Sequence, residues 1–166
     1  MREYIPHSTG CFICGQQNPV GLRHRFFAEN GALYSDVFVP ADYCGFKDVV
    51  HGGICTALLD ETMGWSPFIF EDSLDRLCFT RSLEVKFRKN TPTMTSLIVE
   101  AKYQGMHKGI CEVTGELKDA SGTVFASASG RFIPIPPEKM NETIQYLVME
   151  DGVCYHEKCI KYLKGI

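Results

Sequence analysis

Two features of the stretch 49–65 could do chemistry: a carboxylate at Asp60, and a pair of glycines, Gly52 and Gly53, that follows His51. The glycines precede a run of good helix formers without proline, which predicts a helix that begins near residue 52 or 53. Free N–H groups at a helix start can bind an anion or a developing oxyanion. A carboxylate can act as a base or a nucleophile. These groups together favour attack on a carbonyl carbon.

Gly53 and Asp60 cannot both reach one substrate from the same helix. They are seven positions apart, which corresponds to about 10 Å at about 1.5 Å per residue. A reacting carbonyl needs both groups within about 3 Å. If both act on one substrate, Gly53 must come from one protomer and Asp60 from another, on helices that run antiparallel about a two-fold axis.

The helix is expected to pack against a sheet on most of its circumference. Asp60 lies on a stripe of small residues where another backbone can come close. A mildly polar back is expected at Cys55, Thr62 and Ser66, and Ser66-Pro67 is expected to end the helix. A structural role for Asp60, as the cap of a neighbouring turn with the glycines serving only packing, stays open.

Composition narrows the class of protein. The 166 residues, 45% hydrophobic and 22% charged, are typical of one globular domain. A net charge of −3 argues against nucleic acid or a membrane surface as a partner. No signal-peptide pattern opens the chain and no apolar run approaches a membrane span, so we expect a cytoplasmic protein.

Further elements must hold the helix in place. Alternating apolar and polar residues predict strands over 83–88, 97–103, 111–118 and 124–133. Upstream, two apolar runs flank Asn30-Gly31, a strong hairpin signal. Residues 138–149 space their apolar side chains as one helical face. A hairpin, a helix and then a strand meander is an α+β order with mostly antiparallel pairing.

The spacing from His51-Gly52-Gly53 to Asp60 resembles that of the PaaI-like hotdog-fold acyl-CoA thioesterases. The opening over residues 11–22, with CxxCG followed by Asn-Pro, is similar to the lead-in of many relatives, and the resemblance runs to about residue 132. It implies a hotdog fold, an antiparallel sheet wrapped around a long central helix. It also implies a homodimer or dimer of dimers that cleaves an acyl-CoA substrate at the subunit interface with no cofactor.

The resemblance also implies roles for single residues. Asp60 would be the base or nucleophile, the Gly53 N–H the oxyanion donor, and Thr80 a hydroxyl near the attacking water. His51 would shape the helix start or serve as a third catalytic member. The residues expected to bind the substrate are Gly52, Glu61, Arg88, Lys89, Asn90 and Lys108. Of these, Arg88, Lys89, Asn90 and Lys108 are expected near the coenzyme A phosphates. Glu61 is an alternative catalytic carboxylate or a structural partner.

Eight cysteines are many for the expected compartment. Four stand singly among apolar neighbours and should behave as small hydrophobes. Cys11 and Cys14 form half of a zinc or redox motif, whose second half could only be Cys154, His156 and Cys159. We expect a turn near the substrate entrance and no metal, while a metal- or redox-regulated protein stays an alternative.

The chain is expected to divide into an irregular lead-in with the CxxC motif (1–21), a hotdog thioesterase domain (22–134) and a helical appendage (135–166). A rival to hydrolysis is a non-catalytic acyl-CoA-binding hotdog module, a sensor or interaction protein. The carboxylate of Asp60 separates the two hypotheses, because a binder has no need of it.

Overall fold

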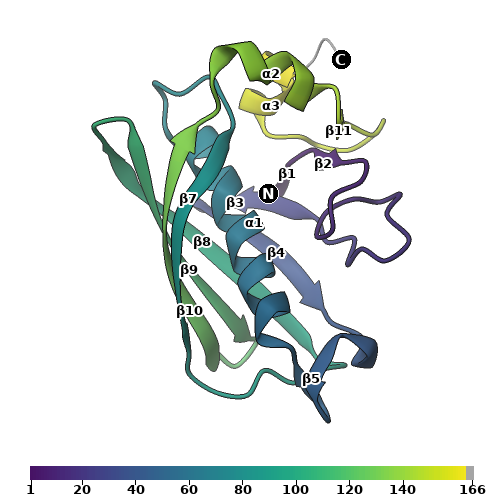
Figure 1. Ribbon diagram of the computed structural model, residues 1–166. Helices are drawn as coiled ribbons and strands as arrows, with labels where there is room; N and C mark the ends of the chain where they lie inside the picture. The colour runs from purple at the N-terminus through teal and green to yellow at the C-terminus, as the bar shows by residue number, and fades with distance from the viewer. Residues whose placement is uncertain (164–166) are drawn as a thin grey trace.

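In the computed structural model, which describes residues 1–163, a long helix lies against a large antiparallel sheet that wraps around it (Figure 1). The helix is α1 (Gly52–Phe70). The sheet has seven strands, and every neighbouring pair is antiparallel. Their order is β1 (Glu3–Tyr4), β3 (Phe26–Glu29), β4 (Ala32–Phe38), β8 (Ser96–His107), β9 (Ile110–Asp119), β10 (Val124–Pro134) and β7 (Cys78–Phe87). The α+β hotdog architecture is confirmed.

Short elements complete the described chain. They are β2 (His7–Ser8), the 3-10 helix η1 (Ala41–Tyr43), β5 (Cys44–Phe46), β6 (Val49–Val50), α2 (Pro137–Ile144), β11 (Leu147–Val148) and α3 (Glu157–Leu163). None of the helices within residues 1–163 has the length and apolar character needed to cross a membrane.

The hairpin expected at Asn30-Gly31 is present between β3 and β4. Asn30 has φ 50° and Gly31 has φ 76°, the two positive values that a type I′ turn requires. Asparagine and glycine tolerate this conformation better than other residues. The turn therefore fixes the register in which Ala28 faces Leu33.

The expected end and the expected back of α1 are both wrong. The helix continues through Pro67 to Phe70, and burial of Phe68 and Ile69 in the core offsets the hydrogen bond that proline cannot make. Cys55, Thr62 and Ser66 are buried rather than exposed, at 1%, 0% and 0% exposure. The hydroxyl of Thr62 donates to the Leu58 carbonyl at 2.8 Å, which satisfies its polar group inside the core.

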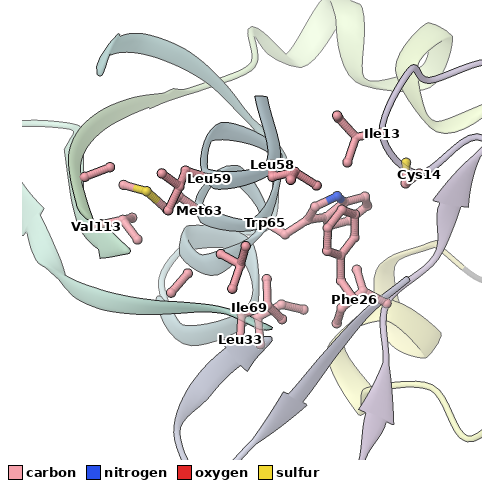
Figure 2. Close-up of a cluster of buried hydrophobic side chains, with 14 of the residues drawn as sticks. Ile13, Cys14, Phe26, Leu33, Leu58, Leu59, Met63, Trp65, Ile69 and Val113 are labelled. Atoms are coloured by element: carbon pink, nitrogen blue, oxygen red, sulfur yellow. The ribbon is translucent and has the colours of Figure 1, made fainter. Parts of the chain in front are cut away.

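The core lies between α1 and the sheet. Figure 2 shows Met63 and Leu59 pointing toward Val113 of β9, while Ile13 and Cys14 of the lead-in lie beside Trp65 on the other side of the helix. All six are buried. The lead-in is thus part of the core, which its irregular sequence did not indicate.

Glycine in β9 brings the sheet close to the helix. A Cβ added at Gly115 would lie 2.8 Å from the Met63 Sδ and 3.0 Å from its Cγ. No larger side chain fits without moving Met63, so the central packing of helix on sheet depends on this residue.

The N-terminal lead-in and the C-terminal segment lie side by side where β2 and β11 pair (Figure 1). Leu147 and Val148 pair with Ser8 and His7 as a two-stranded sheet. The prediction of one helix over 138–149 is therefore wrong beyond residue 144, because pairing with β2 satisfies backbone groups that a longer helix would leave unpaired on the lead-in.

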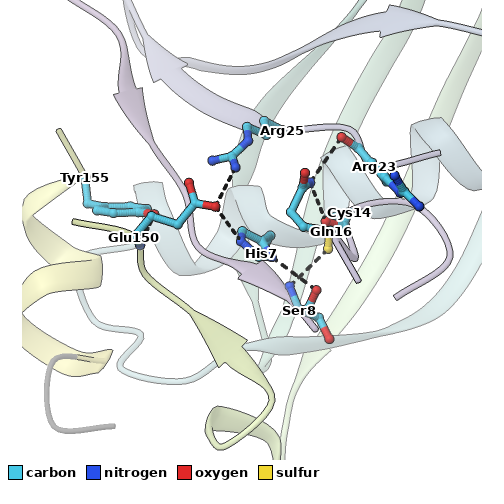
Figure 3. A network of polar contacts seen from close by, with 8 residues as sticks. All are labelled: His7, Ser8, Cys14, Gln16, Arg23, Arg25, Glu150 and Tyr155. Carbon is cyan, nitrogen blue, oxygen red and sulfur yellow. Dashed lines mark hydrogen bonds and ion pairs between the residues drawn. The ribbon is translucent and has the colours of Figure 1, made fainter. Parts of the chain in front are cut away.

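Polar contacts hold both the C-terminal segment and the lead-in turn in place. In Figure 3 the guanidinium of Arg25 donates to the Glu150 carboxylate at 2.7 Å, and the Glu150 N–H donates to the Tyr155 hydroxyl at 2.8 Å. The Gln16 amide donates to the carbonyls of Cys14 and Arg23, at 2.9 and 3.1 Å. The two bonds from Gln16 hold the turn that carries the two cysteines.

The expected segment boundaries at 21/22 and 134/135 stay a prediction. Both end segments contact the sheet region, since Tyr4 pairs with Phe27 and the Tyr4 N–H donates to the Cys154 carbonyl at 2.8 Å. The last three residues of the expected appendage, 164–166, lie outside the described residues.

Candidate active site

A cavity of about 520 Å³ lies beside the middle of α1, between β7, the lead-in and the C-terminal segment. Its floor is formed by α1, one wall by the start of β7, and its cover by α2 and the residues that follow it. Its lining residues are Ser8, Cys14, Asp60, Glu61, Gly64, Trp65, Leu77, Cys78, Phe79, Thr80, Ile135, Lys139, Glu142, Thr143, Tyr146 and Leu147.

Three of the sequence-predicted site residues line this cavity: Asp60, Glu61 and Thr80. The Thr80 hydroxyl, on β7, donates to Asp60 Oδ1 at 2.8 Å. Asp60 is half-buried, and burial raises the pKa of its carboxyl group while the hydrogen bond from Thr80 acts in the opposite direction. The carboxylate thus points into a partly desolvated space with one oxygen held in place.

Gly53 and His51 lie at the start of α1, away from Asp60, and neither lines the cavity. The Gly53 N–H donates to the His51 Nδ1 at 2.9 Å, so His51 caps the first turn of α1. The proposed oxyanion donor is therefore occupied within the single chain. This cap agrees with the expectation that His51 shapes the start of the helix.

The small-residue stripe of α1 is its least covered side. Gly53 is exposed, and Ala57, Asp60 and Gly64 are half-buried. The neighbouring edge strand β7 pairs with β10 on one side, and no strand within residues 1–163 pairs with its other side. An open edge of 10 residues beside an uncovered helix face is a surface on which a second sheet can add.

The expected phosphate-binding residues are not brought together within one chain. Arg88, Lys89 and Asn90 are exposed and follow β7 at the end of the sheet where Phe87 covers Gly52. Lys108 lies in the turn between β8 and β9, which the register of β9, β10 and β7 puts at the opposite end of the sheet.

The structure gathers a cluster that the sequence did not predict. Cys11, Cys14 and Glu61 place their sulfur and carboxylate atoms within 4.8 Å of one another. Glu61 Oε1 lies 3.4 Å from Cys11 Sγ and 3.3 Å from Cys14 Sγ. Burial, followed by the Cys11 sulfur, raises the pKa of the Glu61 carboxyl group to about 8.

The second half expected for the cysteine motif lies elsewhere. Cys154 is exposed, Cys159 is buried in α3, and His156 lies 3.8 Å from Glu3. In the part of the chain that the structure describes, no group of metal-binding side chains joins them to Cys11 and Cys14. The sequence favours an appendage that covers the core or forms an oligomer contact, and the structure adds that residues 139–147 help to line the cavity. Nothing in their sequence marks them as lining a site.

Comparison with other sequences gives one informative relative. The sequence matches no protein-family model. An uncharacterized protein of Schizosaccharomyces pombe is 28% identical over 151 residues, which cover 85% of this chain and 83% of that protein.

Solved structures of thioesterase-superfamily proteins share the fold. The thioesterase superfamily protein RHA08564 aligns with a TM-score of 0.68 and 22% identity over 74% of this chain, which spans only 59% of that protein. The Escherichia coli PaaI protein, from the phenylacetic acid degradation operon, aligns with a TM-score of 0.60 and 16% identity over 69% of this chain and 81% of its own. A Streptococcus mutans protein bound to acetyl CoA aligns with a TM-score of 0.61 and 14% identity, over 72% and 94%. The chain has the hotdog fold of these proteins.

Proposed function

We propose that this protein is an acyl-CoA thioesterase, which hydrolyses a thioester to a free acid and coenzyme A. The observation that carries the proposal is the Asp60 carboxylate, oriented by the Thr80 hydroxyl at 2.8 Å on the wall of a cavity large enough for an acyl group. Neighbours in the thioesterase superfamily and a neighbour bound to acetyl CoA support this choice of substrate class.

Asp60 acts on the thioester carbonyl in one of two ways. As a base, it takes a proton from water while the water oxygen bonds to the carbonyl carbon, and the carbon–sulfur bond then breaks. As a nucleophile, its own oxygen bonds to the carbonyl carbon, the carbon–sulfur bond breaks with release of the coenzyme A thiolate, and water then cleaves the resulting mixed anhydride. In both routes the proton that water loses ends on the Asp60 carboxylate or on the thiolate of coenzyme A.

The oxyanion donor comes from a second protomer in this proposal. Two chains that join their β7 edges would run their α1 helices side by side and antiparallel, which brings Gly53 of one near Asp60 of the other. The His51 ring must then share or release the Gly53 N–H that it accepts at 2.9 Å. His51 therefore controls access to the oxyanion donor rather than serving as a base.

The rest of coenzyme A extends away from the cavity toward charged residues. Arg88, Lys89 and Asn90 lie at the same end of the sheet as the start of α1, where they can contact phosphates together with the Gly52 backbone. The register puts Lys108 at the end of the sheet where Thr80 lies. Two protomers that join their β7 edges antiparallel would therefore bring Lys108 of one chain toward Arg88, Lys89 and Asn90 of the other. Glu61 contributes to the cavity wall beside Asp60.

A non-catalytic acyl-CoA-binding protein is the second candidate. The observation that favours it is the bond between His51 and the Gly53 N–H, since a binding module needs no free oxyanion donor. A binding module gives no reason, however, for the half-buried carboxylate of Asp60 in the cavity.

Thiol release from acyl-CoAs with short, medium, long and aromatic acyl groups separates the candidates. We expect saturable release of coenzyme A from at least one of them, measured alongside equilibrium binding of each compound. Saturable binding of a compound without release of coenzyme A above buffer would favour the binding module. The absence of both binding and release for every compound would exclude both candidates.

A further inference from the structure

The turn that carries Cys11 and Cys14 has the geometry of a metal-binding knuckle. The backbone N–H groups of Ile13 and Cys14 donate to the Cys11 sulfur at 3.3 and 3.4 Å. The Ser8 N–H donates to the Cys14 sulfur at 3.4 Å. Hydrogen bonds from backbone amides stabilise the thiolate, which is the form of cysteine that binds a metal.

Gly15 closes this turn. Its N–H donates to the Cys11 carbonyl at 2.9 Å, and a Cβ at this position would lie 2.4 Å from the same carbonyl oxygen. Because that contact is with backbone, any other residue would open the turn and separate the two sulfur atoms. The sequence CxxCG therefore fixes the positions of both thiols before any ion binds.

The third member of the cluster is Glu61 of α1. Its Oε1 lies 3.3 Å from the Cys14 sulfur and 3.4 Å from the Cys11 sulfur. With usual zinc–sulfur and zinc–oxygen bond lengths, a tetrahedral site has sulfur–oxygen edges of about 3.5 Å. The spacing of these atoms thus matches that of ligands around one zinc ion. In the metal-free cluster both thiols donate to Glu61 Oε1, and a bound cation would take the place of these two protons. A disulfide would instead pair the sulfur atoms and leave the carboxylate without a partner.

We propose that Cys11, Cys14 and Glu61 bind one Zn²⁺ ion, which joins the N-terminal lead-in to α1 at the wall of the cavity that holds Asp60. Two thiolates and a carboxylate suit zinc rather than magnesium or calcium, which prefer oxygen ligands. Three protein ligands leave one tetrahedral position for water or a substrate atom. Cys14 and Glu61 both line the cavity, so this position is reached from the cavity.

The inference does not depend on the proposed hydrolysis, and metal content tests it directly. The full chain is purified under reducing conditions without chelator, and zinc per chain is measured by plasma mass spectrometry. We expect one zinc per wild-type chain. Glu61→Gln and Cys11→Ser should weaken zinc binding by at least about 10-fold, while the matched control Cys154→Ser, at an exposed cysteine, should retain it.

A second measurement on the wild-type chain guards against variants that fail to fold. Co²⁺ added to metal-free, reduced protein should give the near-ultraviolet charge-transfer bands of thiolate ligands and the visible bands of a tetrahedral site. Reduced protein that binds neither Zn²⁺ nor Co²⁺ would overturn the proposal. Full zinc retention in folded Glu61→Gln and Cys11→Ser, or its loss in Cys154→Ser, would also overturn it.

Discussion

Thr80 and Asp60 come from different elements, yet the Thr80 hydroxyl donates to the Asp60 carboxylate at 2.8 Å across the cavity. Asp60 is in the middle of α1 and Thr80 is near the start of the edge strand β7. The bond therefore joins α1, which carries Asp60, to the edge strand β7, with which a strand of a second chain can pair. It fixes one oxygen of the carboxylate and leaves the other for a substrate or water.

Thr80→Val should lower kcat for thioester hydrolysis by about 10-fold, because a hydrogen bond to a charged group contributes about 1.5 kcal/mol or more. Valine keeps the shape of threonine and removes only the hydroxyl. Steady-state kinetics should show most of the change in kcat, with little change in KM. Thr80→Ser should restore most of the rate. Ser82→Ala, on the same strand, is the control, and a larger loss in that variant would show that Ser82 orients the carboxylate instead.

Phe87→Asp should convert the proposed dimer to a single chain. Phe87 is 58% exposed at the end of β7, and a charge there opposes burial between two joined sheets. Light scattering coupled to size exclusion gives the mass. Phe38→Asp, at a residue 47% exposed on β4 inside the sheet, should keep the wild-type mass. A wild-type mass of one chain would contradict dimerisation through β7.

Gly115→Val should lower the free energy of unfolding by about 1–3 kcal/mol, because overpacking forces Met63 and the helix away from the sheet. Chemical denaturation followed by circular dichroism measures the change. Thr114→Val adds the same side chain at an exposed position on the same strand and should change stability by about 0.5 kcal/mol or less. Equal effects of the two substitutions would mean that Met63 adapts without cost.

Stability should fall as the pH drops below about 6.5, in part because of His24. Burial lowers the pKa of His24, whose Nδ1 lies 2.9 Å from the Asp36 carbonyl oxygen. The unfolded chain binds a proton at higher pH than the folded chain, so the contribution is complete above the unfolded pKa and is lost below it. Each pKa unit of lowering corresponds to about 1.4 kcal/mol.

Denaturation at about pH 7.5 and about pH 5.5 tests this linkage. His24→Gln cannot take up the proton, so its stability should change less between the two pH values than that of the wild type. His107→Gln, at an exposed histidine, should follow the wild type. A change in His24→Gln equal to that of the wild type would contradict the assignment.

Local patterns were enough to predict much of the fold. The glycine pair marked the start of α1, Asn30-Gly31 marked a hairpin whose dihedral angles confirm the expected turn, and two-residue periodicity identified the strands after the helix. These signals depend on neighbours in sequence. The end of α1 depended on tertiary packing of Phe68 and Ile69, which no local pattern around Pro67 indicates.

Within the site, a local pattern identified Asp60 on α1, whereas Thr80 on β7 was expected only from the family resemblance. Asp60 was singled out by its position on a stripe of small residues, and the structure brings it to Thr80. The cluster of Cys11, Cys14 and Glu61 joins residues 47 to 50 positions apart in sequence. Sequence reasoning paired the cysteines with other cysteines, because a carboxylate ligand has no spacing signature of its own.

Hydrolysis by wild type and Asp60→Asn, compared on the acyl-CoA that the wild type cleaves fastest, tests the central claim most directly. Asparagine has nearly the same shape but cannot take up a proton or attack the carbonyl. The proposal predicts that kcat falls by about 100- to 10,000-fold while acyl-CoA binding and the folded structure are retained. Asp42→Asn, at an exposed aspartate, should be unchanged. Undiminished thiol release by correctly folded Asp60→Asn would contradict the role of Asp60 in the reaction.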